Sequence, residues 1–142
     1  MRVFVPFSSD AELAAIGKGL LAQTLPKSEW NHGAHFAAAL WLLEINAADT
    51  MPELIRRYNQ ATGVANTDMS GYHQTITLAS IRAARIFRKQ RPQSPIFTVC
   101  NELMATQLGK SDWLLSYWSR EKLFSVEARR SWVEPDLKPL QF

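Results

Sequence analysis

The chain has 142 residues, which is the size of one ordinary domain and enough to bury a core without disulfides or metal. Hydrophobic residues make up 46% of it and charged residues 20%, a balance that excludes an intrinsically disordered chain. The net charge of +3 is too small to indicate a nucleic-acid-binding protein unless the basic residues gather in a patch.

Cysteine content and hydropathy narrow the class of protein further. Cys100 is the single cysteine, so an intramolecular disulfide is excluded and a disulfide-stapled secreted module is not expected. The longest apolar run, Ala34–Leu43, is much shorter than the roughly 18 residues that a membrane span needs. No targeting or lipidation motif is visible. We therefore expect a soluble cytoplasmic protein with no membrane partner.

The spacing of apolar residues predicts helices along almost the whole chain. Capping boxes at Ser9 and Thr50, and prolines and glycines at the expected ends, mark the limits of the helices. The predicted helices cover residues 10–24, 28–46, 50–63, 72–90, 95–108, 113–118 and 125–132. Two prolines in residues 133–140 predict an extended C-terminal arm. We see neither a repeat nor a linker, so residues 1–142 are expected to form one all-α domain.

The second predicted helix should lie at the centre of this domain. Its middle, Ala34–Leu43, is apolar on every face, which is typical of a helix surrounded by other helices. The fold class is therefore an all-α bundle of about six helices around a central buried helix. We expect six side chains to be almost completely buried: Phe36, Leu40, Leu43, Ile76, Phe97 and Leu103.

All three histidines lie in two short polar segments, each at the start of an otherwise apolar helix. His32 and His35 are three residues apart and therefore share one helix face. In the fourth predicted helix, His73, Thr77 and Ser80 form a stripe opposite the arginines. That stripe is expected to point inward, so the two histidine segments can meet at one polar cavity.

Three interpretations of this histidine cluster stay open. Three imidazoles could bind a divalent metal through His32, His35 and His73. A pocket without metal could bind or convert a small molecule with the same histidines, Tyr72, Gln74 and Thr77. The cluster could instead be a structural hydrogen-bond network in a non-catalytic helical module, each imidazole bonded to a carbonyl.

Several segments together resemble an uncharacterised bacterial family of all-α proteins. They are Trp30–Phe36, Gly71–Thr77, Leu123–Arg129 and Trp132–Leu137, and they match that family's Trp-x-His-x-Ala-His, Tyr-His-Glu-Thr and Val-x-Pro-Asp-Leu motifs. The resemblance implies a helical fold and one constellation of His32, His35, Tyr72 and His73. The chain departs from the family at Gln74, where glutamate is expected. Because an amide cannot act as a general base, an activity that used this carboxylate would be lost here.

Other reactive or charged residues favour ordinary structural roles. Cys100 lies among apolar residues of a predicted helix, where a thiol is unreactive, so we interpret it as part of the core. The basic residues Arg82, Arg85, Arg88, Lys89 and Arg91 lack interleaved aromatic residues and any recognition-helix pattern. We interpret them as a solvated helix face and expect no nucleic-acid partner.

Overall fold

The computed structural model describes residues 4–142, which form helices and no strand. The seven α-helices in this part of the chain are α1 (Asp10–Ala22), α2 (His32–Glu44), α3 (Met51–Ala61), α4 (Gln74–Gln90), α5 (Ile96–Met104), α6 (Arg120–Leu123) and α7 (Val126–Arg130). Four 3-10 helices lie between them: η1 (Lys27–Glu29), η2 (Ala48–Thr50), η3 (Gln107–Gly109) and η4 (Trp113–Ser116). The predicted all-α fold is confirmed.

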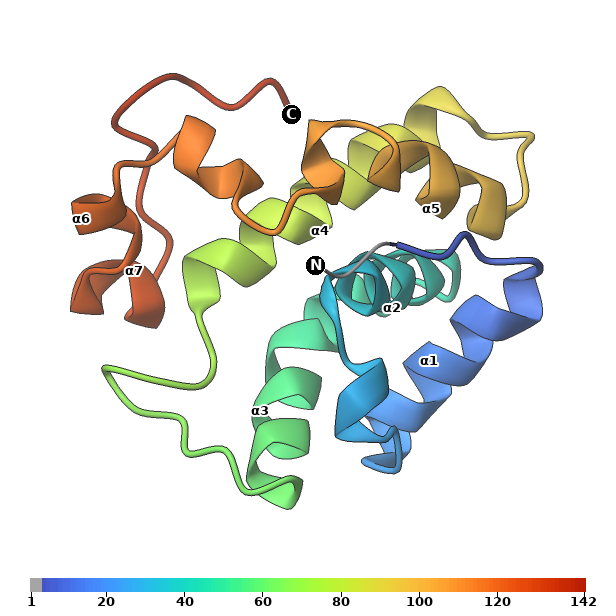
Figure 1. Ribbon diagram of the computed structural model, residues 1–142, viewed down its shortest axis with the longest axis horizontal. Coiled ribbons are helices and arrows are strands. Elements are labelled where there is room, and N and C mark those ends of the chain that lie inside the picture. Colours follow the sequence, from blue (N-terminus) through green and yellow to red (C-terminus); the bar gives the residue numbers. More distant parts are fainter. Residues whose placement is uncertain (1–3) are drawn as a thin grey trace.

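Helix α2 lies in the middle of the bundle, with α1, α4 and α5 packed against it (Figure 1). Five consecutive residues, Phe36 to Leu40, have no exposed surface, so every side of this helix contacts protein. A helix that is apolar all round avoids water only in such a position. The predicted central helix is therefore confirmed.

The contact between α1 and α2 depends on a glycine. Gly17 is buried in α1, and a Cβ atom at this position would overlap the indole ring of Trp41 in α2. Glycine in a helix costs roughly 1 kcal/mol compared with alanine. Here its missing side chain lets the Trp41 ring lie directly on the backbone of α1.

The caps that begin the helices differ from those predicted. The Ser9 hydroxyl caps nothing, and the Thr50 hydroxyl donates to the carbonyl of Ala47. Both predicted capping boxes are therefore wrong: the N–H of Glu12 bonds to the carbonyl of Ser9, and the carboxylate of Glu12 accepts from the N–H of Ser8. The side chains that do accept a hydrogen bond from the first turn of an α-helix belong to Asn31, His73, Ser119 and Ser125.

Helix limits agree within about two residues for α1, α3 and α4, but α2 begins at His32, four residues after its predicted start, and η1 precedes it. Helix α5 ends at Met104, four residues before its predicted end, and η3 follows. The predicted helix at 113–118 is the 3-10 helix η4, and α6 was not predicted. This region has many short turns, and one turn carries too little apolar periodicity to be detected from sequence.

The residues after α7 form no helix and are fixed to the body of the protein. The Trp118 indole donates to the carbonyl of Val133 at 3.0 Å, and the carboxylate of Asp136 accepts from both the backbone N–H and the hydroxyl of Ser119. The carbonyl of Tyr117 accepts from the N–H of Leu137 at 2.8 Å. The predicted arm is thus docked along its length.

The arginines of α4 mostly face solvent, as predicted, although several also bond. Arg82 and Arg85 are exposed, and the guanidinium of Arg82 lies 4.0 Å from the ring centre of Trp132. Arg88 pairs with Glu44 of α2 at 3.1 Å.

None of the helices in residues 4–142 combines the length and the hydrophobicity that crossing a lipid bilayer requires.

Of the six predicted core residues, three are completely buried and three are not. Phe36, Leu40 and Leu103 have no exposed surface. Leu43, Ile76 and Phe97 are only partly buried at the edge of the core, so their prediction is wrong in degree. Helical phase alone does not show how far the neighbouring helices extend over each position.

Two leucines of α2 provide a test of this core. We expect Leu40→Ala to lower the free energy of unfolding by about 2–5 kcal/mol, because it leaves a cavity where no water enters. Leu43→Ala is the matched control at a partly exposed site and should cost clearly less. Urea denaturation measures both. Equal losses, or a loss below about 0.5 kcal/mol for Leu40→Ala, would contradict the central place of α2.

Candidate functional site

His73 is the N-cap of α4, and both of its ring nitrogens are hydrogen-bonded to the backbone. Its Nδ1 accepts from the N–H of Ile76 at 3.2 Å, while its Nε2 lies 2.7 Å from the carbonyl oxygen of Leu123. A carbonyl only accepts, so Nε2 carries the proton and the imidazole is neutral. Burial, together with the nearby charge of Arg129, lowers the pKa of His73 although the bond to Leu123 opposes this shift. His73 therefore has no free nitrogen for a metal or a substrate.

His32 makes the same kind of bond at the start of α2. Its Nε2 lies 2.7 Å from the carbonyl oxygen of Leu108 in η3, 76 residues further along the chain. The imidazole also packs edge-on against Phe36, with ring centres 5.3 Å apart. His32 thus fixes η3 to α2.

His35 lies on the face of Trp30, with ring centres 3.9 Å apart and an angle of 23° between the ring planes. Trp30 in turn meets the ring of Tyr58 edge-on at 5.7 Å. Burial, and to a smaller degree the neighbouring His32, lowers the pKa of His35 from 6.5 to about 4. The ring is therefore neutral at physiological pH and acts as a flat packing surface.

The three histidines thus do not form the predicted metal site. Their rings contact three different partners, and residues 4–142 contain no group of three or more His, Cys, Asp or Glu side chains arranged to bind a metal. The inward direction of His73 was predicted correctly. The error lies in its end point, which is a backbone carbonyl.

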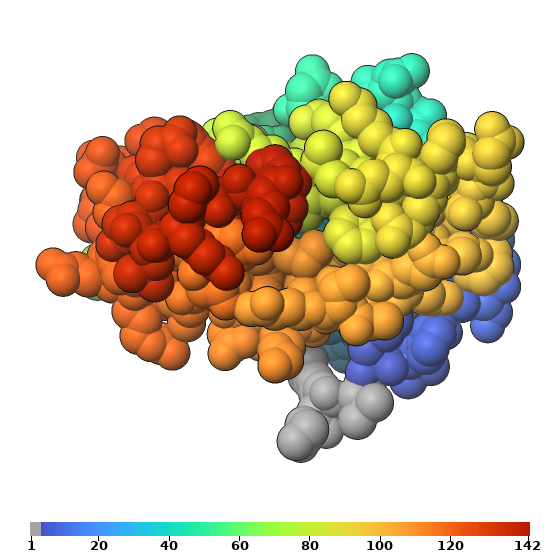
Figure 2. Space-filling model, turned by 90° about the horizontal axis from the view of Figure 1, so that it is seen from above, coloured from blue at the N-terminus to red at the C-terminus, as the bar shows by residue number. Residues whose placement is uncertain are grey.

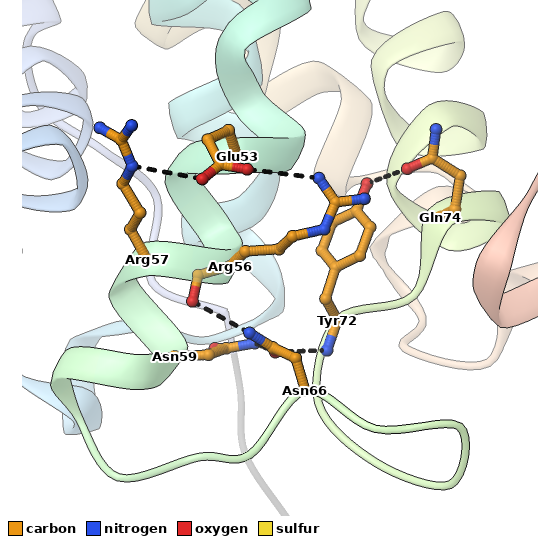
Figure 3. A network of polar contacts seen from close by, with 7 residues as sticks. All are labelled: Glu53, Arg56, Arg57, Asn59, Asn66, Tyr72 and Gln74. Carbon is orange, nitrogen blue, oxygen red and sulfur yellow. Dashed lines mark hydrogen bonds and ion pairs between the residues drawn. The ribbon is translucent and has the colours of Figure 1, made fainter.

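Tyr72 and Gln74 are bonded to each other beside Arg56 of α3 (Figure 3). The Tyr72 hydroxyl donates to the side-chain carbonyl of Gln74 at 2.5 Å, and the Arg56 guanidinium lies 4.2 Å from the centre of the phenol ring. Burial raises the pKa of Tyr72, so the phenol keeps its proton. Thr77, the last candidate, is buried and donates its hydroxyl proton to the carbonyl of His73. These side chains satisfy one another and leave no base beside the phenol.

Asn66, which the sequence analysis missed, organises the loop before α4. Its side-chain oxygen accepts from the N–H of Tyr72 and from the amide of Asn59, and its amide donates to the carbonyl of Arg56 (Figure 3). One asparagine therefore joins α3, the loop and Tyr72. A loop rich in asparagine, threonine and aspartate was the only sequence signal, and it does not single out this residue.

The start of α4 is also bonded to the C-terminal part of the chain. The Thr75 hydroxyl donates to the carbonyl of Ser131 at 2.9 Å and accepts from the N–H of Val133 at 3.2 Å. Arg129 donates to the carbonyls of Gly71 and Tyr72. Three of the four segments that carry the family resemblance, Gly71–Thr77, Leu123–Arg129 and Trp132–Leu137, therefore meet here through bonds to the backbone.

A cleft of about 280 Å³ lies elsewhere, between the end of α4, η3, η4 and the C-terminal residues. Figure 2 shows the last residues, in red, beside the yellow end of α4. The residues that line this cleft are aromatic, aliphatic or amide-bearing, apart from the hydroxyl of Thr106: Ile86, Phe87, Gln90, Thr106, Gln107, Leu108, Trp113, Tyr117, Gln141 and Phe142. We name it the aromatic cleft. None of the predicted site residues lines it, but His32 holds the backbone of Leu108 in its wall.

A second cleft, of about 420 Å³, is formed by α1, α2 and α3. Its lining is mainly apolar, with Glu53 and Arg57 as the charged residues. The remaining reactive side chain, Cys100, is completely buried, and burial raises the pKa of its thiol to about 12. Its interpretation as a core residue agrees with this position.

Comparisons of the chain with protein-family models, curated proteins and solved structures found no match.

The low pKa of His35 predicts a loss of stability in acid. The folded protein disfavours the imidazolium, so stability is complete above pH 6.5 and declines as the pH falls from 6.5 to about 4. The loss attributable to this histidine is at most about 3 kcal/mol. In His35→Phe, which keeps a flat ring against Trp30, unfolding by urea should vary less over this pH range. Identical pH profiles for the two proteins would contradict the assignment.

Two substitutions separate the two bonds of His73. His73→Asn keeps a good N-cap but is too short to reach Leu123, whereas His73→Ala removes both bonds. We expect both variants to be destabilised and the alanine variant by about 1 kcal/mol more, the usual value of an N-cap. Thermal or urea unfolding measures the difference. A stability unchanged by either substitution would show that these bonds do not hold the fold.

Proposed function

We propose that the protein is a non-catalytic helical module that binds a small, flat, uncharged aromatic molecule in the aromatic cleft. The observation that carries this proposal is the chemistry of the lining, which combines four aromatic side chains with three primary amides. Rings stack on a flat ligand, and amides pair with its donors and acceptors. A cleft of this volume is at the small end of ligand sites.

Binding without catalysis follows from what the lining contains. The phenol of Tyr117 is the one acid–base group among the described residues that line the cleft, and no carboxylate, imidazole, thiol or amine there accompanies it. General acid–base catalysis needs both an acid and a base within hydrogen-bond reach of the reacting atoms, and a single phenol does not provide that pair. The histidines, which do titrate near neutrality in free form, are bonded to backbone or stacked and act as structural braces.

The side chains around the cleft also hold its rings in place. The ammonium of Lys138 lies 4.8 Å from the ring centre of Tyr117, and the Arg91 guanidinium lies 4.5 Å from that of Phe87. Trp113 and Tyr117 meet edge-on at 6.0 Å. Rings fixed before binding lose little conformational entropy when a ligand arrives.

Binding of simple probes tests the proposal. We expect benzamide to bind with a dissociation constant on the order of 1 mM, as its few atoms allow. Cyclohexanecarboxamide, which cannot stack, and benzoate, which loses the amide and brings a charge, should bind at least about tenfold more weakly. Ligand-observed NMR and calorimetry measure all three.

A matched pair of substitutions locates the binding. Ile86→Trp fills the cleft and should abolish benzamide binding without unfolding the protein. Gln93→Trp introduces the same ring at an exposed position outside the cleft and should leave binding unchanged. Equal binding by all three probes, or binding that survives Ile86→Trp, would contradict the proposal.

We also propose that the protein is cytoplasmic, that it belongs to the bacterial family named above, and that it has no nucleic-acid partner. The buried thiol of Cys100 agrees with a reducing compartment. The pairing of Arg88 with Glu44 and of Arg91 with Glu102 reduces the charge that the basic face could offer to phosphates.

A further inference from the structure

The second cleft has the features of a self-complementary surface. It is lined by Leu21 of α1, by Trp41, Leu42, Ile45 and Ala47 at the end of α2, and by Thr50, Glu53, Leu54 and Arg57 at the start of α3. We name it the apolar groove. Its lining is mainly apolar, and nothing in residues 4–142 fills its volume of about 420 Å³.

Two of the large apolar side chains that line this groove are also exposed to solvent. Leu21 is 54% exposed and Ile45 is 50% exposed. Single exposed apolar residues are common on protein surfaces. Here two of them adjoin an apolar hollow, so that the same face offers both projecting side chains and a space that can receive them.

The two charged residues of the groove can pair with the same two residues of a second copy of the chain. Glu53 and Arg57 lie one helical turn apart on α3, 3.3 Å from each other, and their side chains are 56% and 60% exposed. In a pair related by a two-fold axis, the same residues meet in reversed order. Glu53 of each copy then faces Arg57 of the other, so neither charge meets its like.

We propose that a second copy of this chain occupies the apolar groove, and that the protein is a symmetric dimer. Leu21 and Ile45 of each copy enter the groove of the other, and Glu53 and Arg57 form reciprocal ion pairs at its edge. The dimer leaves the aromatic cleft open, because α4, η3, η4 and the C-terminal residues form that cleft. Formation of the dimer is therefore independent of ligand binding in the aromatic cleft.

The oligomeric state is measured by sedimentation velocity over a concentration series. The groove is small, so we expect a weak dimer with a dissociation constant on the order of 10 µM. Ile45→Glu, which places a charge in the partner's groove, should weaken the dimer at least about tenfold. Met69→Glu makes the same change at a position that is 80% exposed and outside the groove, and it should leave the dimer unchanged.

Charge reversal tests the two-fold geometry. In Glu53→Arg alone, arginine faces arginine across the axis, and in Arg57→Glu alone, glutamate faces glutamate. Each variant should therefore be mainly monomeric at protein concentrations of about 10–50 µM, which are on the order of the dissociation constant expected for the wild-type dimer. An equimolar mixture of the two variants restores both opposite-charge pairs and should form a heterodimer.

Three results would overturn the proposal. They are a wild-type protein that stays monomeric at about 500 µM, well above the expected dissociation constant, a dimer that Ile45→Glu does not weaken, and a mixture of the two charge variants that fails to associate. Circular dichroism of each variant controls for folding. The substituted residues are exposed, so the monomer should keep its helical spectrum.

Discussion

One neutral imidazole connects the two halves of this protein. His73 accepts a hydrogen bond from the N–H of Ile76 in α4 and donates one to the carbonyl of Leu123 in α6, and only the neutral ring can do both. Protonation would replace the acceptor with a donor facing the N–H of Ile76. The start of α4, and with it Thr75 and the docked C-terminal residues, is in its place because this ring stays uncharged.

Three further polar side chains of the interior follow the same principle. His32 bonds to the carbonyl of Leu108, Tyr58 to that of Leu25 and Trp118 to that of Val133. A buried carbonyl in an irregular segment has no helical partner, and leaving it unpaired costs roughly 1–3 kcal/mol. The chain contains many short turns after Met104, and the carbonyls of Leu108 and Leu123 in this region accept from His32 and His73. These two histidines therefore act as donors to buried backbone, whereas His35 packs against Trp30.

The sequence predicted the parts of the fold that depend on local spacing. The apolar run around Phe36 identified the central helix. The position of the arginines on α4 correctly predicted that His73 points toward the interior. The partners of the histidines could not be predicted, because Leu108 and Leu123 lie 76 and 50 residues away and offer backbone atoms that every residue has. The aromatic cleft was missed for a related reason. Trp113 and Tyr117 look like core residues in sequence, and only the tertiary arrangement shows that the packing beside them is incomplete.

Within residues 4–142, the hydrogen bonds that join the most distant positions in the sequence belong to Phe7 and Asp10. The amide of Asn101 exchanges two hydrogen bonds with the backbone of Phe7, both 2.9 Å long, and Asp10 accepts from the N–H of Phe97. Closing a loop of this length costs entropy that local helix contacts do not repay. During synthesis Phe7 and Asp10 can therefore form these bonds only after α5 has left the ribosome. Helical proteins usually fold fast because their contacts are local, but here the last step joins residues 94 positions apart, which should slow folding relative to a simple up-and-down bundle.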